Sequence, residues 1–168
     1  MVVIFAILAL ILGFVMADVI HIIDRTKYDQ DVAQFAQTLQ YAAEQAAVRG
    51  TEMALALEIY EGHYTIWQAN PKDEYDPEVD EPVISRRTLR ESYLEEITYE
   101  DGSHQYSGDL IFRCTPRGWP SSVVFTIIDL DKRYHYVLLE RFTNRVTVSP
   151  RPLEIPEPRT ELSIDVPI

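Results

Sequence analysis

Histidine and carboxylate side chains, the usual groups for metal binding and acid–base chemistry, are scattered along this 168-residue chain. No two histidines have the spacing of a metal-ligand pair, and the phosphate-binding, nucleophile-elbow and zinc-protease motifs are missing. Glu95 and Glu96 are adjacent, so in a strand they would face opposite sides. The histidines are His21, His63, His104 and His135. We therefore predict a protein that is not an enzyme, without catalytic residues, cofactor or histidine-based metal site.

An acidic segment, residues 70–82, is a second place where an ion could bind. It contains six carboxylates, three prolines and one lysine. Calcium is held by several carboxylate oxygens, so a calcium site is one interpretation, although the spacing of an EF-hand loop is absent. A solvated surface loop is the interpretation that we favour.

Net charge and cysteine content narrow the possible partners. The formal net charge is −12, whereas nucleic-acid binding requires a surplus of Lys and Arg on one face, so we expect no nucleic-acid partner. Cys114 has no second cysteine with which to form an intrachain disulfide, and its place in a predicted strand favours a small buried side chain over a reactive thiol. Trp67 and Trp119 are predicted to be core residues, with contact to a partner as the alternative.

The chain begins with an apolar run, which is the first predicted structural element. Residues 1–17 contain no charged side chain, and a membrane-spanning helix needs roughly 17–25 apolar residues. No basic residue precedes the run and no convincing cleavage site follows it, which disfavours a cleaved signal peptide. We predict that residues 1–23 form a membrane-spanning helix segment. Its representative side chains are Val2, Phe5, Leu8, Leu10, Leu12, Phe14 and Val15.

Residues 24–50 continue the same helix with an amphipathic pattern. Apolar residues recur at steps of three or four, which places them on one face. The residues that we expect to pack on a sheet are Val32, Phe35, Leu39, Ala42, Ala43 and Ala46. Arg49 and Gly50 are typical of a helix end, with a cation in the last turn and glycine after it. The whole helix would have about 48 residues and a length of roughly 70 Å.

Residues 51–149 change to a period of two and predict a β-rich domain. Residues 52–59 alternate between apolar and polar or small side chains, and 64–66 can return as the partner strand of a hairpin. Further strands are expected within 88–100, 108–114, 122–130, 134–142 and 146–149, with 122–130 central in its sheet because it is rich in β-branched and aromatic residues. Residues 150–168 are proline-rich and predict an extended or disordered tail that could add a weak edge segment. The expected fold class is α+β, with the second half of one long helix packed on an antiparallel sheet.

Two stretches resemble bacterial filament subunits. The run "MVVIFAILALILGFV" resembles the start of mature type IV pilins and type II secretion pseudopilins, directly after their characteristic glutamate. The stretch from 35 to 67 is similar to the GspH/FimT group of minor pseudopilins, whose helix ends in arginine and glycine, here Arg49 and Gly50, directly before a strand. Phe112, Pro116 and Gly118 match a later motif of the group. Asn144 stands where the group usually has glycine, so we expect it in a left-handed turn.

The resemblance implies a structural role in a bacterial inner membrane. Such a subunit would be anchored by its helix, with the β domain in the periplasm. It would then join other pilin or pseudopilin subunits through an inner-membrane assembly platform, near the tip of a type II secretion pseudopilus or type IV pilus that supports protein secretion. The resemblance also implies that a leader peptide, a methylated first residue and the glutamate precede residue 1.

Two other interpretations remain open. A single-pass membrane protein could carry a periplasmic β domain that binds a ligand or a protein partner, and a membrane-tethered enzyme is disfavoured by the missing motifs. A simple anchor needs no helix that continues about 30 residues beyond the lipid, whereas a pilin-like subunit needs this half to support its β domain. The helix therefore favours the filament subunit.

Overall fold

The computed structural model describes residues 2–69 and 82–156, with side chains from residue 26 onward. One helix and nine strands make up this part of the chain, and the strands form two antiparallel sheets. This confirms the expected α+β class, a long N-terminal helix packed on antiparallel β-structure. The strands are β1 (Met53–Glu58), β2 (His63–Gln68), β3 (Pro82–Thr88), β4 (Ser92–Tyr99), β5 (His104–Gln105), β6 (Asp109–Cys114), β7 (Val123–Asp129), β8 (Tyr134–Leu139) and β9 (Val146–Ser149).

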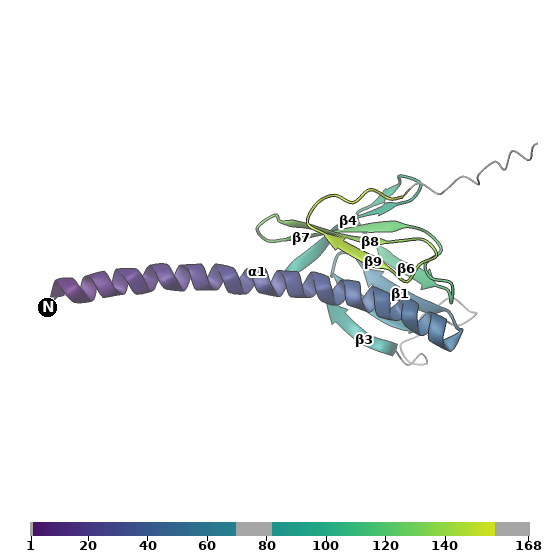
Figure 1. Ribbon diagram of the computed structural model, residues 1–168, viewed down its shortest axis with the longest axis horizontal. Helices are drawn as coiled ribbons and strands as arrows, with labels where there is room; N and C mark the ends of the chain where they lie inside the picture. The colour runs from purple at the N-terminus through teal and green to yellow at the C-terminus, as the bar shows by residue number, and fades with distance from the viewer. Residues whose placement is uncertain (1, 70–81, 157–168) are drawn as a thin grey trace, which may run out of the picture.

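Helix α1 (Val2–Arg49) is a single element of 48 residues, as the periodicity predicted. Its second half lies along the strands, and its first half extends away from them (Figure 1). The helix ends where Gly50 adopts a φ of 65°, a left-handed conformation that favours glycine. Within the residues that the structure describes, no helix is both long and apolar enough to cross a membrane. The seven side chains expected in lipid, from Val2 to Val15, lie outside the described side chains.

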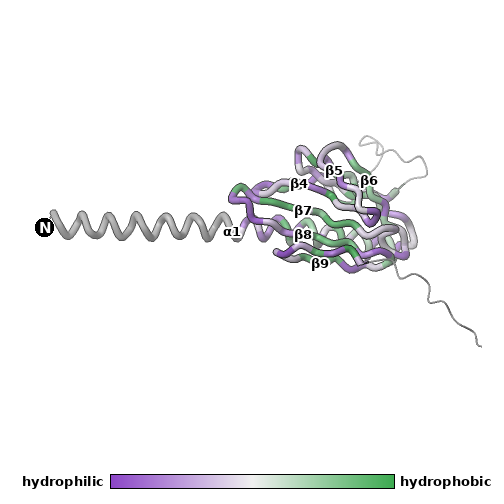
Figure 2. The backbone as a smooth tube through the Cα atoms, turned by 90° about the horizontal axis from the view of Figure 1, so that it is seen from above, coloured by the Kyte–Doolittle hydropathy of each residue, from purple (hydrophilic) through white to green (hydrophobic). Residues whose placement is uncertain are grey.

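The two sheets lie on either side of a shared core, to which strands of both contribute side chains. One sheet has the order β3-β2-β1-β6 and the other β5-β4-β7-β8-β9. Strand β7 is central and buried at all seven positions, which confirms the prediction from its composition. Its hydrophobic colour runs along the middle of the second sheet in Figure 2.

Two strands were not predicted. Strand β3 begins at Pro82, which closes the segment interpreted as a loop, and Pro is tolerated there because a first strand residue need not donate to the ladder. Residues 88–100 were expected to form one strand region, but Leu89 to Glu91 form a turn between β3 and β4, which belong to different sheets. Strand β5 has only two residues, too few to give a periodic signal.

One expected backbone conformation is wrong. Asn144 does not have a positive φ; the left-handed residue of this turn is Phe142, with a φ of 55°. The N–H of Phe142 donates to the carbonyl oxygen of Trp119 at 2.8 Å, so a hydrogen bond to a distant turn, rather than local residue preference, sets the conformation.

The described part of the C-terminal tail lies over the outer face of the second sheet. Leu153 and Ile155 are half-buried while their neighbours are exposed. Together with Val124 and Thr126 of β7 they line a cavity of 420 Å³. Residues 150–156 form no strand, so the tail covers a sheet face instead of adding to an edge. The prediction for residues 157–168 lies outside the described residues.

Candidate functional site

The apolar face of α1 joins the helix to both sheets. Its side chains are at most 7% exposed, while a position between them, Tyr41, is 39% exposed. Burial of this face removes enough apolar surface from water to hold the helix on the domain. The buried helix residues are Tyr28, Val32, Phe35, Ala36, Thr38, Leu39, Ala42, Ala43 and Ala46.

Phe35 is the central contact of this interface. Its ring lies 5.1 Å from that of Tyr64 in β2 and 5.3 Å from that of Phe125 in β7, both in edge-to-face geometry. The Phe125 ring also contacts Phe112 in β6, at 5.4 Å. Aromatic pairs in this geometry add to the free energy of burial. One helix side chain therefore connects the two sheets.

Tyr28 adds a polar contact at the edge of the buried face. Its hydroxyl lies 3.0 Å from the carbonyl oxygens of Ile127 and Arg133, at the end of β7 and in the turn that follows. Burial, followed by the negative charge of Asp129, raises the pKa of the Tyr28 hydroxyl, so it remains a hydrogen-bond donor. Asp129 is buried and accepts from the Arg133 guanidinium at 2.6 Å.

Asp31 and Thr38 bind the first sheet to the helix. One carboxylate oxygen of Asp31 accepts the backbone N–H groups of Arg90 and Glu91, both at 2.8 Å. The Thr38 hydroxyl accepts a hydrogen bond from the Arg87 guanidinium at 3.1 Å. The carboxylate thus satisfies two donors in the turn where the chain passes between the sheets. No pattern in the sequence predicts these contacts, because they join residues about 50 to 60 positions apart.

Pro116 and Gly118, two of the residues matched by resemblance, lie in the connection between β6 and β7. Gly118 has a φ of 101°, and a Cβ added there would lie 2.6 Å from the carbonyl oxygen of Thr143. Thr115 and Gly118 exchange backbone hydrogen bonds of 2.9 and 3.1 Å across a tight turn that contains the exposed Pro116. Only glycine fits between this turn and the 142–143 backbone. At the end of α1, Arg49 donates to Gln45 at 3.1 Å.

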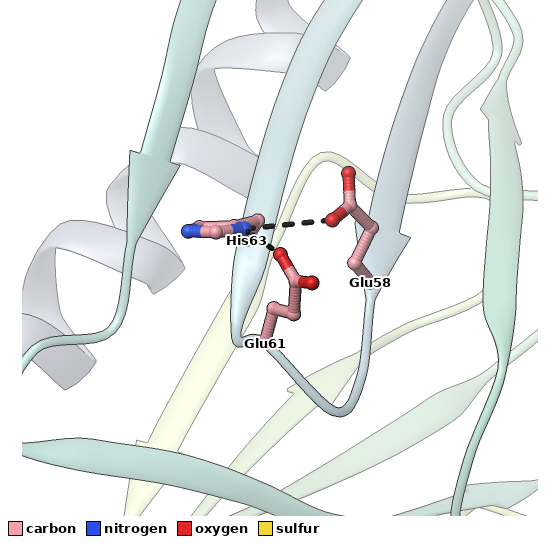
Figure 3. A group of neighbouring side chains, drawn as sticks. All are labelled: Glu58, Glu61 and His63. Atoms are coloured by element: carbon pink, nitrogen blue, oxygen red, sulfur yellow. Dashed lines mark ion pairs between the residues drawn. The ribbon is translucent and has the colours of Figure 1, made fainter.

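Three ionisable side chains meet at the β1–β2 hairpin. Figure 3 shows Glu58, Glu61 and His63, with His63 Nδ1 2.8 Å from a Glu61 oxygen and 3.4 Å from a Glu58 oxygen. Their ligand atoms lie within 4.8 Å of one another, a spacing that could hold a metal ion. The Arg86 guanidinium already lies among them, with Nη2 2.6 Å from Glu58, 3.1 Å from Glu61 and 2.5 Å from His63. The cluster is thus balanced by a cation of the chain itself.

Cys114 and Trp119 are confirmed as core residues, whereas Trp67 is buried outside the core between the sheets. Cys114 and both tryptophans are no more than 2% exposed. Burial raises the pKa of the Cys114 thiol to about 12, so the thiol stays protonated and unreactive at neutral pH. Trp119 belongs to the core between the sheets, whereas Trp67 pairs in register with Ala54 and shares the outer face of the first sheet.

Comparison with solved structures identifies the fold. The chain is similar to the type IV minor pilin FimU of Pseudomonas aeruginosa, with a TM-score of 0.54 and 12% identity over 75% of this chain and 90% of that one. A second crystal form of FimU gives a TM-score of 0.52 at 12% identity, covering 73% and 92%. The minor pseudopilin EpsH from the Type 2 Secretion System of Vibrio cholerae gives 0.57 at 14% identity, covering 76% and 99%.

Comparisons based on the sequence found no further similar protein. No family model matches the chain, and no curated protein matches its sequence. At 12–14% identity the similarity shows a shared fold. The fold is the pilin-like one that the resemblance at the helix end implied.

Proposed function

We propose that this protein is a minor structural subunit of a type IV pilus or of a type II secretion pseudopilus. The observation that carries the proposal is the joint occurrence of a minor-pilin-like fold and a helix of 48 residues whose first half extends away from that fold. In such a subunit the projecting half supplies contacts to neighbouring helices, and the β domain faces outward.

Before assembly, the proposed subunit is held in the bacterial inner membrane by residues 1–23. The sequence supports this step because its first 17 residues carry no charge. The β domain then lies in the periplasm, and the assembly platform moves the subunit into a filament beside other pilins or pseudopilins. Gly13 would permit close approach of a neighbouring helix. In this proposal the protein supports secretion structurally, near the filament tip, and performs no chemistry.

Filament incorporation in the host bacterium tests the proposal. Filaments are sheared from cells, purified and analysed by quantitative mass spectrometry for this chain. We expect the wild-type chain to be present in far fewer copies than the main subunit. Leu8→Arg should remove it, because a cation in a helix bundle or in lipid is costly. Val48→Arg, on the exposed surface of the same helix, should leave incorporation unchanged.

The same experiment can contradict the proposal. Wild-type chain that is abundant in the inner membrane but missing from purified filaments would favour the alternative, an anchored β domain that binds a ligand or partner. Mass spectrometry of the mature N-terminus adds an independent readout, since a methylated residue upstream of Met1 would identify a processed pilin-class subunit.

A further inference from the structure

A positively charged groove lies between α1 and the β3–β4 turn. It has a volume of 610 Å³, and its charged lining residues are Lys27, Asp31, Arg86, Arg87, Arg90 and Glu91. Four cations thus face two carboxylates in a chain whose formal net charge is −12. Because the protein as a whole is acidic, this local surplus of positive charge needs a separate explanation.

Internal contacts neutralise only part of this charge. Lys27 lies 3.8 Å from Glu91, and Arg86 pairs with Glu58 and Glu61. Both groove carboxylates thereby have partners, since Asp31 accepts two backbone N–H groups.

Within residues 26–69 and 82–156, the two remaining arginines have no carboxylate partner. Arg87 donates to the neutral Thr38 hydroxyl. Neither Arg87 nor Arg90 has an ion pair with a carboxylate among the residues that the structure describes. Both side chains are exposed, and guanidinium groups bind carboxylates or phosphates in paired hydrogen bonds.

The position of the groove along α1 indicates which anion it binds, a carboxylate or the phosphate of a lipid headgroup. The apolar run ends near Ile23, and the polar layer on each side of a bilayer is only about 5–8 Å thick. Lys27 is four residues further on, roughly 6 Å along the helix axis. Arg87, however, contacts Thr38, 15 residues or roughly 22 Å beyond Ile23. Arg90 lies nearer to the apolar run, because its N–H bonds to Asp31, eight residues or roughly 12 Å beyond Ile23. Lipid headgroups beside Ile23 would therefore reach the Lys27 end of the groove and not Arg87.

We propose that this groove binds a carboxylate-rich segment of a neighbouring, different subunit, with Arg87 and Arg90 as its main contacts. The proposal rests on the assembly role proposed above and assigns it a partner chemistry. The segment pairs with the two arginines and lies along the polar side of α1, next to the turn held by Asp31. Charge complementarity gives such a contact specificity and a fast association rate, and high salt weakens it.

A binding experiment with the full chain in uncharged detergent tests this assignment. The probe is a fluorescent peptide with six glutamates, and its counterpart has glutamine at the same positions. Fluorescence anisotropy should show salt-sensitive binding of the glutamate peptide only. Arg87→Gln with Arg90→Gln should weaken binding at least about tenfold, a loss of roughly 1.4 kcal/mol. Arg117→Gln with Arg145→Gln removes the same charge from exposed sites elsewhere and should change affinity less than about twofold.

Four results would overturn the proposal. The first is no peptide binding at low salt, and the second is equal weakening of binding by both double variants. The third needs the chain in nanodiscs instead of detergent: it is loss of peptide binding when phosphatidylglycerol nanodiscs replace phosphatidylcholine ones. The fourth is wild-type self-association that the Arg87–Arg90 double variant abolishes, which would make the occupant a second copy. Circular dichroism confirms that each variant is folded. Peptide binding by a chain that is missing from purified filaments would contradict the assembly role and leave the groove assignment standing.

Discussion

The two faces of α1 between residues 26 and 49 are built from the same stretch of sequence but hold the domain in different ways. One face is apolar and fills the space between the sheets around Phe35. The other is polar, and at its N-terminal end it contacts the β3–β4 turn through Asp31. The apolar face consists of side chains that recur every three or four residues, whereas the polar face contacts the turn through single atoms, such as one carboxylate oxygen of Asp31. Substitutions in the two faces should therefore change the stability by different amounts.

Removing the central side chain of the apolar face should have the largest effect. Phe35→Ala leaves a cavity beside the rings of Tyr64 and Phe125, and such truncations cost about 3–5 kcal/mol of unfolding free energy. Urea unfolding of the full chain in detergent, followed by fluorescence of the buried Trp67 and Trp119, measures the loss. Tyr41→Ala is the control, because this aromatic on the same helix is 39% exposed and should cost much less.

A similar loss for Phe35→Ala and Tyr41→Ala would contradict the assignment of Phe35 as the link between the sheets. It would mean that the exposed side of α1 contributes as much to stability as the buried side. The difference between the two variants therefore measures the contrast between the faces directly.

The apolar face could be predicted from the sequence because its apolar residues recur at regular steps. Steps of three and four residues mark a helix face wherever the partner lies, and the alternation in β1 marks a strand in the same way. The central place of β7 followed from composition alone. By contrast, Asp31 contacts Arg90 and Glu91, which lie 59 and 60 positions further along the chain. No local sequence pattern predicts such a contact.

Removing the Asp31 carboxylate should have the next largest effect. Asp31→Ala leaves the N–H groups of Arg90 and Glu91 without their acceptor, and each unsatisfied partly buried donor costs about 1–3 kcal/mol when water cannot replace the bond. Glu91 N–H is partly buried and Arg90 N–H is exposed, so we expect a loss near the lower end of that range. The adjacent control is Asp29→Ala, whose side chain is 53% exposed.

Amide hydrogen exchange distinguishes the polar contact from general destabilisation. In Asp31→Ala the amides of residues 90 and 91 should lose protection while those of β7 keep it. Uniform loss of protection across both sheets would show that Asp31 acts on the whole domain and not on this turn.

Tyr28→Phe should have a smaller effect, because it removes one hydroxyl and keeps the ring in place. The lost hydrogen bond to the carbonyl oxygens of Ile127 and Arg133 is worth about 0.5–1.5 kcal/mol. The ring still contacts His135 at 4.9 Å and the Arg133 guanidinium at 5.4 Å. Tyr28→Ala, which removes both, should cost clearly more in the same urea experiment. Equal losses would show that the hydroxyl is the only contribution of this residue.

Local sequence patterns predict the wrong conformation where distant parts of the chain set it. Asn144 has the better intrinsic preference for a left-handed turn, yet Phe142 adopts it because its N–H reaches Trp119. Likewise, 88–100 reads as one extended segment, but the Asp31 carboxylate holds a turn within it. The hairpin cluster of Glu58, Glu61, His63 and Arg86 depends on β3, a strand with no alternation to reveal it.

The smallest expected effect is a pH dependence at the boundary of the two faces. His135 contacts the Tyr28 ring and lies 3.9 Å from Asp29. Burial lowers the pKa of His135 below its ordinary value of 6.5, although Asp29 acts in the opposite direction. The unfolded chain therefore binds a proton at a higher pH than the folded one, so the unfolding free energy must fall as pH decreases from about 6.5 through the lower folded pKa.

Comparing wild type with His135→Gln between pH 7.5 and pH 5.5 isolates this contribution, because both chains share every other titrating group. The wild type should lose more stability over this interval, by less than the loss for Tyr28→Phe. An equal pH dependence in His135→Gln would mean that attraction to Asp29 cancels the effect of burial, and a larger one would mean that attraction outweighs burial. The polar side of α1 would then stabilise the protonated histidine.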